Sequence, residues 1–129
     1  MGFVSNAPAI TFVLSKDVGA LKGFYAEVLG LPLLGEDPFA ATFDLGGGTT
    51  LRLTLVPDHV PGQHTALGWR VDNLDAAIEA MKAAGVAPEI YPGLGQDDSG
   101  VWASPDGSAR LVWFKDPEGN GLSLTEFIA

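Results

Sequence analysis

The same succession of secondary-structure elements is expected twice in this chain of 129 residues, and that repetition constrains its fold more than any other feature. In each half, an apolar run predicts a strand, and apolar residues at helical spacing predict an amphipathic helix after it. The strand and helix lie at 9–14 and 18–29 in the first half and at 66–71 and 74–84 in the second. An aspartate ends each of these strands and a glycine follows at the same spacing: Asp17 and Gly30, then Asp72 and Gly85. Because both pairs share one offset, they indicate a weak internal repeat.

A segment rich in proline separates the two halves. Residues 57–65 (PDHVPGQHT) contain two prolines, a glycine and both histidines, a composition typical of a linker. A chain of this length is expected to form one domain. Within it we expect two modules, 8–56 and 66–128, joined by the linker 57–65. Further strands are predicted at 39–45, 49–56, 86–91, 109–115 and 121–127, and 101–103 is a candidate for strand pairing.

Charge and cysteine content exclude several classes of protein. The chain has 16 acidic and 7 basic residues, and this net charge of −9 argues against nucleic acid and anionic membranes as partners. Because it has no cysteine, it has no disulfide and no cysteine-bound metal. No apolar run is long enough to span a membrane, and no basic residue precedes Lys16. We therefore expect a cytoplasmic protein without a signal peptide.

Small and polar side chains are predicted along one face of the sheet. Alternate residues of a strand face opposite sides, so Thr50, Arg52 and Thr54 share one face and the intervening leucines the other. Ser123 and Thr125 follow the same alternation in the last strand. Rolled into a partial barrel, such a face lines a concave pocket. A solvated sheet face and a dimer surface are the alternatives.

Three segments carry a resemblance to a known family: 17–31 (DVGALKGFYAEVLGL), 71–75 (VDNLD) and 116–120 (DPEGN). They resemble the vicinal oxygen chelate superfamily, which includes glyoxalase I, bleomycin resistance proteins, fosfomycin resistance enzymes and extradiol dioxygenases. The resemblance implies an α+β fold. Two paired βαβββ modules would form a partly open, cup-shaped mixed sheet with the helices on the outside. It does not specify a function, because the fold hosts several chemistries.

Metal-dependent members of that superfamily hold a divalent cation with four His, Glu or Gln side chains. The resemblance places these positions at Ile10, Arg52, Ala66 and Ser123. Isoleucine and alanine have no donor atom, and arginine is a permanent cation that repels a metal. We therefore expect no metal and no other cofactor. The departure argues against the glyoxalase, epoxide-opening and ring-cleaving activities together, since each needs the metal as a Lewis acid.

Among metal-free members, the bleomycin resistance group is the most similar at 65–75 and 115–120. Members of that group are acidic, dimeric and bind a cationic antibiotic in aromatic-lined grooves. The resemblance thus implies a homodimer that sequesters a small organic molecule, cationic or aromatic, without catalysis. Two alternatives stay open. One is a metal-dependent lyase, isomerase or dioxygenase whose displaced metal site uses His59, His64 or aspartates, and the other is a non-catalytic dimeric scaffold.

The candidate ligand-binding residues come from strand alternation and from the aromatic side chains of the second half. They are Phe12, Thr50, Arg52, Thr54, Tyr91, Trp102, Ser123 and Thr125. Trp113 lies inside an apolar run, which favours core or interface packing. Strand alternation places Glu126 on the face opposite to Ser123 and Thr125, so it is not expected to act as a general base in the pocket. We assign no catalytic residue. His59 and His64 lie in the linker and are expected at the surface.

Overall fold

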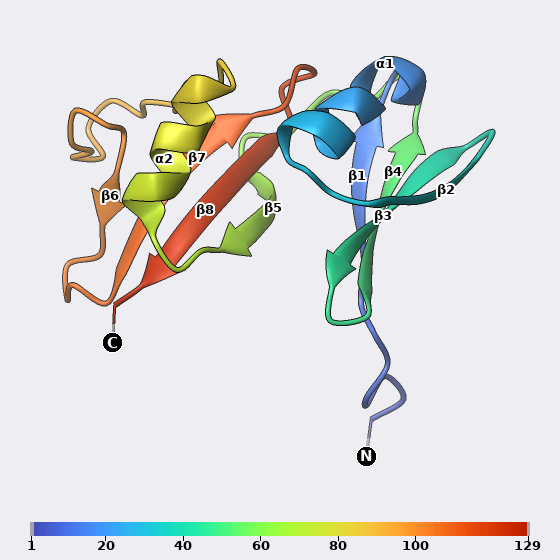
Figure 1. Ribbon diagram of the computed structural model, residues 1–129, viewed down its shortest axis with the longest axis horizontal. Coiled ribbons are helices and arrows are strands. Elements are labelled where there is room, and N and C mark those ends of the chain that lie inside the picture. Colours follow the sequence, from blue (N-terminus) through green and yellow to red (C-terminus); the bar gives the residue numbers. More distant parts are fainter. Residues whose placement is uncertain (1, 129) are drawn as a thin grey trace. The chain divides into compact units, whose positions relative to one another are not determined.

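The computed structural model describes residues 2–128 of the chain. It divides into two compact units, Met1–Val60 and Pro61–Ala129, and the boundary falls inside the segment 57–65. Each unit combines strands with helical segments in the order βαβββ, so the α+β fold expected from the sequence is confirmed (Figure 1). Within residues 2–128, the helices are too short or too polar to cross a membrane.

Unit 1 contains a four-stranded mixed sheet and one helical segment. Its elements are β1 (Ile10–Ser15), α1 (Val18–Gly23), the π-helical turn η1 (Phe24–Val28), β2 (Leu33–Asp37), β3 (Ala40–Gly46) and β4 (Thr49–Leu55). The strands lie in the order β1-β4-β3-β2. β1 runs parallel to β4, and the two other pairs are antiparallel.

Unit 2 repeats this connectivity. Its elements are β5 (Thr65–Arg70), α2 (Leu74–Ala83), β6 (Trp102–Ala103), β7 (Ala109–Lys115) and β8 (Gly121–Phe127). The strands lie in the order β5-β8-β7-β6, with β5 parallel to β8. The matching orders show that the internal repeat is structural, although neither sheet of the described residues closes into a barrel.

The sequence misses one strand of the structure and predicts one that is absent. The sequence does not predict β2, because LLGED has a glycine and no β-branched residue, and this strand forms by pairing with β3. The strand predicted at 86–91 is absent. Pro88 has no N–H to give to a strand ladder. The segment still runs beside β7, since the Glu89 N–H donates to the Trp113 carbonyl at 2.7 Å.

Each helical segment begins with a side-chain cap. Asp17 Oδ1 accepts a hydrogen bond from the Ala20 N–H, which is the usual role of a capping aspartate. In unit 2 the cap is Asn73, whose Oδ1 accepts from the Ala76 N–H. The sequence repeat pairs Asp17 with Asp72. In the structure, the residue equivalent to Asp17 is Asn73, because it caps the second helix.

The two helical segments differ in length by one residue. The glycines that follow them, Gly30 and Gly85, have positive φ angles of 75° and 76°. Counted from the capping residue to this glycine, Asp17 to Gly30 is one residue longer than Asn73 to Gly85. η1 accommodates the additional residue, since the Leu29 N–H donates to the Phe24 carbonyl, five residues earlier, at 3.0 Å.

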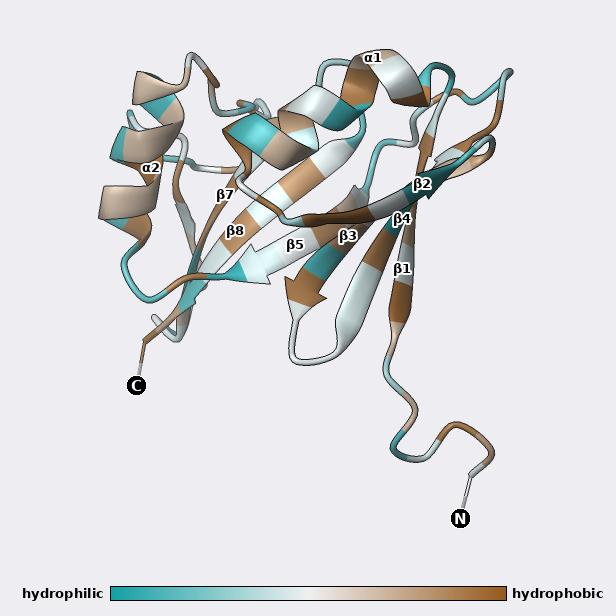
Figure 2. Cartoon of the chain, turned by 45° about the vertical axis from the view of Figure 1, so that its right-hand side comes forward, coloured by the Kyte–Doolittle hydropathy of each residue, from teal (hydrophilic) through white to brown (hydrophobic). Residues whose placement is uncertain are grey.

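The core of each unit lies between its sheet and its helical segment. Figure 2 shows hydrophobic and polar bands alternating along β8. Leu51 and Leu53 of β4 are fully buried, as the alternation predicted, and so is Leu122 of β8. Their buried partners include Leu21, Tyr25 and Phe43 in unit 1, and Leu74, Ile78 and Phe114 in unit 2.

The DPEGN segment builds the turn between β7 and β8. The buried Asp116 carboxylate accepts hydrogen bonds from the backbone N–H groups of Glu118 and Asn120 and from the Asn120 side chain. Gly119 takes a φ of 94°, a conformation that L side chains rarely adopt. The motif therefore has a structural role: it fixes the hairpin register that orients the side chains of β7.

Candidate ligand site

A pocket of about 790 Å³ lies in unit 2, at the end of the sheet where β5 and β8 begin. Its volume falls in the range of about 300–1,000 Å³ that small-molecule sites occupy. Tyr91, Leu94 and Trp113 form apolar parts of its wall, and His64, Thr65 and Lys115 form polar parts. Loop, strand and hairpin segments therefore converge on one cavity.

Hairpin register directs Trp113 into this pocket. Its neighbours Val112 and Phe114 are buried on the helix side of β7, so Trp113 faces the opposite side and is half-buried. Ser123 is its partner on β8. The Tyr91 ring meets the Trp113 ring edge-on, with centroids 5.7 Å apart, and the centroid of the Trp102 ring lies 6.3 Å from that of Trp113. Three aromatic rings thus form one cluster that borders the pocket.

Close contacts at two glycines, one with a side chain and one with the backbone, shape the face beside this cluster. A Cβ atom on Gly121 would lie 2.9 Å from the His64 carbonyl oxygen, so glycine allows β5 to approach β8 there. A Cβ atom on Gly68 would collide with the Ser123 hydroxyl. These two glycines therefore let β5 and β8 pack closely beside the cluster.

One side chain fixes the loop that carries Tyr91 and Leu94. Gln96 Oε1 accepts a hydrogen bond from the Tyr91 N–H at 2.7 Å. Its Nε2 donates to the carbonyls of Glu89 and Gly100 at 2.9 and 2.7 Å. An irregular segment has few backbone partners of its own, and these three bonds replace them. The sequence does not single out Gln96, because no local pattern predicts such contacts.

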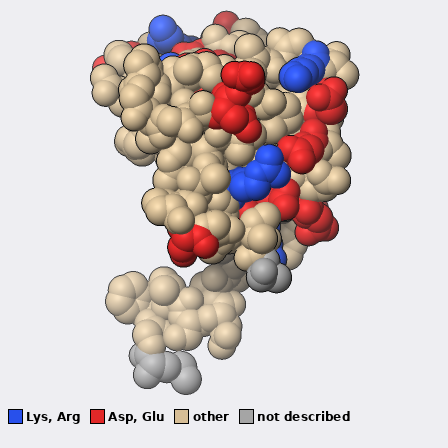
Figure 3. All heavy atoms as spheres, turned by 90° about the vertical axis from the view of Figure 1, so that its left-hand side faces the viewer, with Lys and Arg blue, Asp and Glu red and all other residues tan. Residues whose placement is uncertain are grey.

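The charges around the pocket are few. Lys115 Nζ lies 3.2 Å from Glu89 Oε1, in an ion pair whose two side chains are 48% and 35% exposed. Among residues 2–128, the pocket lining includes Lys115 and His64 but no Asp or Glu. Elsewhere on the surface, acidic groups are scattered among uncharged atoms and outnumber basic ones on the face shown in Figure 3.

Four of the predicted ligand residues lie in unit 2. Tyr91 lines the pocket and Trp102 contacts Trp113. Ser123 and Thr125 share the pocket-side face of β8, opposite Trp113 and Leu111 of β7. Trp113, for which the sequence favours packing, itself lines the pocket. The DPEGN hairpin could have indicated this position of Trp113, because the register of the hairpin pairs Trp113 with the predicted site residue Ser123.

The other four predicted ligand residues lie in unit 1. Thr50, Arg52 and Thr54 share the face of β4 that turns away from the buried leucines. Phe12 is the register partner of Arg52 on β1 and is 57% exposed. The guanidinium of Arg52 lies 3.4 Å from Asp37 Oδ2. The Phe39 N–H is the main cause that lowers the pKa of Asp37, and Arg52 contributes to the same shift.

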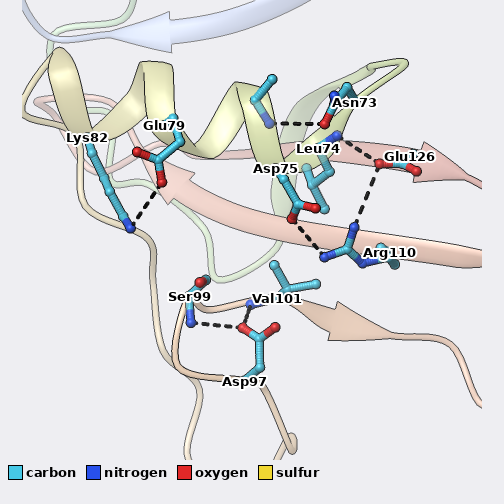
Figure 4. A network of polar contacts seen from close by, with 11 residues as sticks. Asn73, Leu74, Asp75, Glu79, Lys82, Asp97, Ser99, Val101, Arg110 and Glu126 are labelled. Carbon is cyan, nitrogen blue, oxygen red and sulfur yellow. Dashed lines mark hydrogen bonds and ion pairs between the residues drawn. The ribbon is translucent and has the colours of Figure 1, made fainter.

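Two further candidates are placed by the structure. His64 is exposed, as the sequence predicted, and it also lines the pocket of unit 2. Glu126 faces α2, as its alternation predicted: its carboxylate accepts from the Leu74 N–H at 2.8 Å (Figure 4). Arg110 lies 3.8 Å from Glu126 and donates to Asp75 at 3.0 Å. This network stabilises the start of α2 on the sheet face opposite the pocket.

The two βαβββ units agree with the family that the sequence matches. The chain belongs to the Glyoxalase/Bleomycin resistance protein/Dioxygenase superfamily, because the sequence model of that family matches residues 8–124. No curated protein matches the chain.

Two solved structures illustrate the range of similar proteins. TnmS3, an antibiotic binding protein from Streptomyces sp. CB03234, is 26% identical, with a TM-score of 0.72 and coverage of 95% of this chain and 97% of that one. A lactoylglutathione lyase from Agrobacterium tumefaciens is 22% identical, with a TM-score of 0.71 and coverage of 94% and 93%. The second likeness shows the fold alone.

The metal-binding positions of the superfamily do not fit a metal in this chain. Ile10 and Arg52 lie on the same sheet face in unit 1, and Ser123 of unit 2 has only a hydroxyl to offer. Ala66 lies at a register irregularity of β5. Within residues 2–128, no three His, Cys, Asp or Glu side chains gather as a metal site. The side chains at these four positions therefore lack the imidazole and carboxylate donors with which the superfamily holds a metal.

Proposed function

We propose that this protein binds a planar organic molecule in the pocket of unit 2 and sequesters it without making or breaking a bond. The observation that carries the proposal is the cluster of Tyr91, Trp113 and Trp102 beside a pocket of about 790 Å³. Aromatic side chains supply large apolar contact surfaces and stack on flat ligands. The half-buried Trp113 offers such a surface without a change in the core.

The chemistry of the four family metal positions supports binding without a reaction. Ile10, Arg52, Ala66 and Ser123 give no imidazole or carboxylate to a cation. The likeness to TnmS3, which is an antibiotic binding protein, agrees with this function. We therefore propose that no metal takes part in the binding.

Titration of the full chain with 2-naphthol tests this function. Calorimetry should detect binding, and mass spectrometry should recover the compound unchanged. Replacement of Trp113 by Leu should weaken binding about tenfold, equivalent to about 1.4 kcal/mol, because a ring contact is lost. Trp69→Leu is the matched control, since residue 69 lies on the other face of its strand. Equal effects of the two variants, or a stoichiometric divalent metal in protein purified without chelator, would contradict the proposal.

We also propose that the chain forms a homodimer. The large apolar side chains that unit 1 exposes by more than half include Ile10, Phe12, Leu34 and Phe39, which lie in or beside its strands. Exposed apolar groups in such number are typical of interaction surfaces. Sedimentation analysis should give twice the chain mass of 13.4 kDa, and a monomer across the accessible concentrations would overturn this part.

A further inference from the structure

The local charge of the pocket differs in sign from the net charge of the protein. The chain carries a net charge of −9, which by itself favours a cationic ligand. The described lining of the pocket has a different character, since its one side chain that is charged at pH 7 is the cation Lys115 and it includes no carboxylate. A ligand inside the pocket meets Lys115 directly, whereas Glu89, 3.2 Å from the Lys115 ammonium nitrogen, lies outside the pocket lining.

Screening by salt decides whether the net charge of the protein or the charge of the pocket lining has the larger effect on a bound ligand. At physiological ionic strength the Debye length is about 8 Å, so exposed acids farther away than this contribute little inside the pocket. Lys115 is one of the residues that line the cavity, so its ammonium group lies well within this length of the cavity. The local ammonium group therefore outweighs the summed surface charge.

The partner of Lys115 leaves its charge available. Glu89 lies 3.2 Å from the ammonium nitrogen, but both side chains are partly exposed. Exposed ion pairs of this kind contribute little net stability. A lysine ammonium has three donors, so it can keep Glu89 and still donate to a ligand. Glu89 itself is not among the lining residues.

The spacing along β7 sets the distance between the ring surface and the charge. Trp113 and Lys115 are two residues apart on one strand, so they share a face and lie about 7 Å apart along it. Gly121 is the register partner of Lys115 and Ser123 that of Trp113, so both positions face small neighbours. A fused aromatic ring with an attached acidic group spans this distance.

We propose that the pocket of unit 2 selects aromatic molecules that bear an acidic group, a carboxylate or an acidic phenol. The ring lies against Tyr91 and Trp113, and the anion receives a hydrogen bond from Lys115. This inference rests on the proposed function and names its ligand class.

Three naphthalene probes of similar shape and different charge test the proposal: 2-naphthoate, 2-naphthol and 2-naphthylmethylammonium. Calorimetry on the full chain should show naphthoate binding about tenfold tighter than naphthol, and the ammonium compound weakest. High salt should narrow the difference. An ammonium compound that binds as tightly as naphthoate would overturn the acidic ligand class and leave the binding function standing. If none of the three binds, the proposed function itself fails.

Two variants of the ion pair should act in opposite directions. Lys115→Gln should weaken naphthoate about tenfold and naphthol much less. Glu89→Gln removes the competing carboxylate and should tighten naphthoate binding severalfold. Lys82→Gln is the matched control, because Lys82 forms an exposed ion pair with Glu79 on α2, outside the pocket lining. A uniform loss for all three probes in Lys115→Gln would show a structural role for Lys115 and overturn the proposal.

Discussion

Units 1 and 2 share one connectivity, but the offset between equivalent residues changes along the chain. The register pair Phe43–Leu51 of unit 1 corresponds to Phe114–Leu122 of unit 2. The glycines after the helices, Gly30 and Gly85, lie closer together in the sequence than Phe43 and Phe114 do. Unit 2 is therefore longer than unit 1 between its helix and its last hairpin. The pocket loop lies in this additional segment, so the candidate site arises where the repeat breaks.

The two units also differ in the size of the side chains on the sheet face that lies away from the helices. In the alignment that the hairpin registers give, Thr42 of unit 1 corresponds to Trp113 of unit 2, and Arg52 corresponds to Ser123. The strand partner of Arg52 is Phe12, whereas that of Ser123 is Gly68. Unit 1 has a small residue on β3 and bulky ones beside it, and unit 2 has the reverse. The comparison teaches that one scaffold can place its large aromatic surface in only one of its two copies.

The largest expected effect tests whether the two cores are equivalent. Phe43→Ala and Phe114→Ala each remove a buried ring from an equivalent position. Each should lower the free energy of unfolding by about 3–5 kcal/mol, because a cavity remains. Denaturant titration measures the loss.

Phe3→Ala is the control for these core variants, since Phe3 is fully exposed and lies outside the four residues of the proposed dimer surface, so its loss should change the free energy by less than about 0.5 kcal/mol. A loss of less than about 1 kcal/mol in one of the two core variants would show that the equivalence of the two units stops at the backbone.

The next effect concerns the segment that only unit 2 has. Gln96→Ala removes three hydrogen bonds that join residues 89, 91 and 100, and should cost about 1–3 kcal/mol of loop stability. Amide exchange at residues 91–101 should accelerate, and 2-naphthol should bind more weakly because Tyr91 loses its fixed position. Asp98→Asn, an exposed change in the same loop, should alter neither measurement. Unchanged exchange in Gln96→Ala would show that the loop is held by other contacts.

The fold could be predicted from the sequence to the extent that local patterns determine it. Alternation in 49–56 and 121–127 correctly gave the buried leucines, and the glycines after both helices were correctly located. β2 could not be predicted, because its pairing with β3 decides it. The absence of the strand at 86–91 could have been predicted, because Pro88 is visible in the sequence and has no N–H for a strand ladder.

The candidate site was only partly accessible to the same reasoning. Tyr91 was recognised as a candidate and lines the pocket, but Trp113 required the hairpin register to separate it from its buried neighbours. Gln96 and Lys115 depend on contacts between segments that no period or motif in the sequence encodes. The exposed residues predicted in unit 1 stay predictions for ligand binding.

The smallest effect compares the turns that precede the third strand of each unit. Hydrogen bonds from the hydroxyl and N–H groups of Ser108 and from the Ser104 hydroxyl lower the pKa of Asp106 from its ordinary value near 3.8 to about 2. Backbone N–H groups, that of Phe39 first, lower the pKa of Asp37 in unit 1. A carboxyl group whose pKa is lowered by folding stabilises the folded state at pH values above the pKa that the group has in the unfolded chain. The contribution of Asp106 should thus be complete above pH 3.8 and lost as the pH falls through about 2.

Carbon NMR titration of the carboxyl groups separates the two turns. Ser108→Ala should raise the pKa of Asp106 toward its ordinary value, because its largest cause is removed, and should leave Asp37 unchanged. Ser99→Ala, in a neighbouring loop, is the control. In unit 1, Arg52→Gln should raise the pKa of Asp37 only slightly, since Arg52 is the smaller cause beside the backbone donors. A large shift of Asp37 in that variant would mean that the Arg52–Asp37 contact, and not the turn backbone, holds this carboxylate, and the two turns would then differ in mechanism as the two sheet faces do.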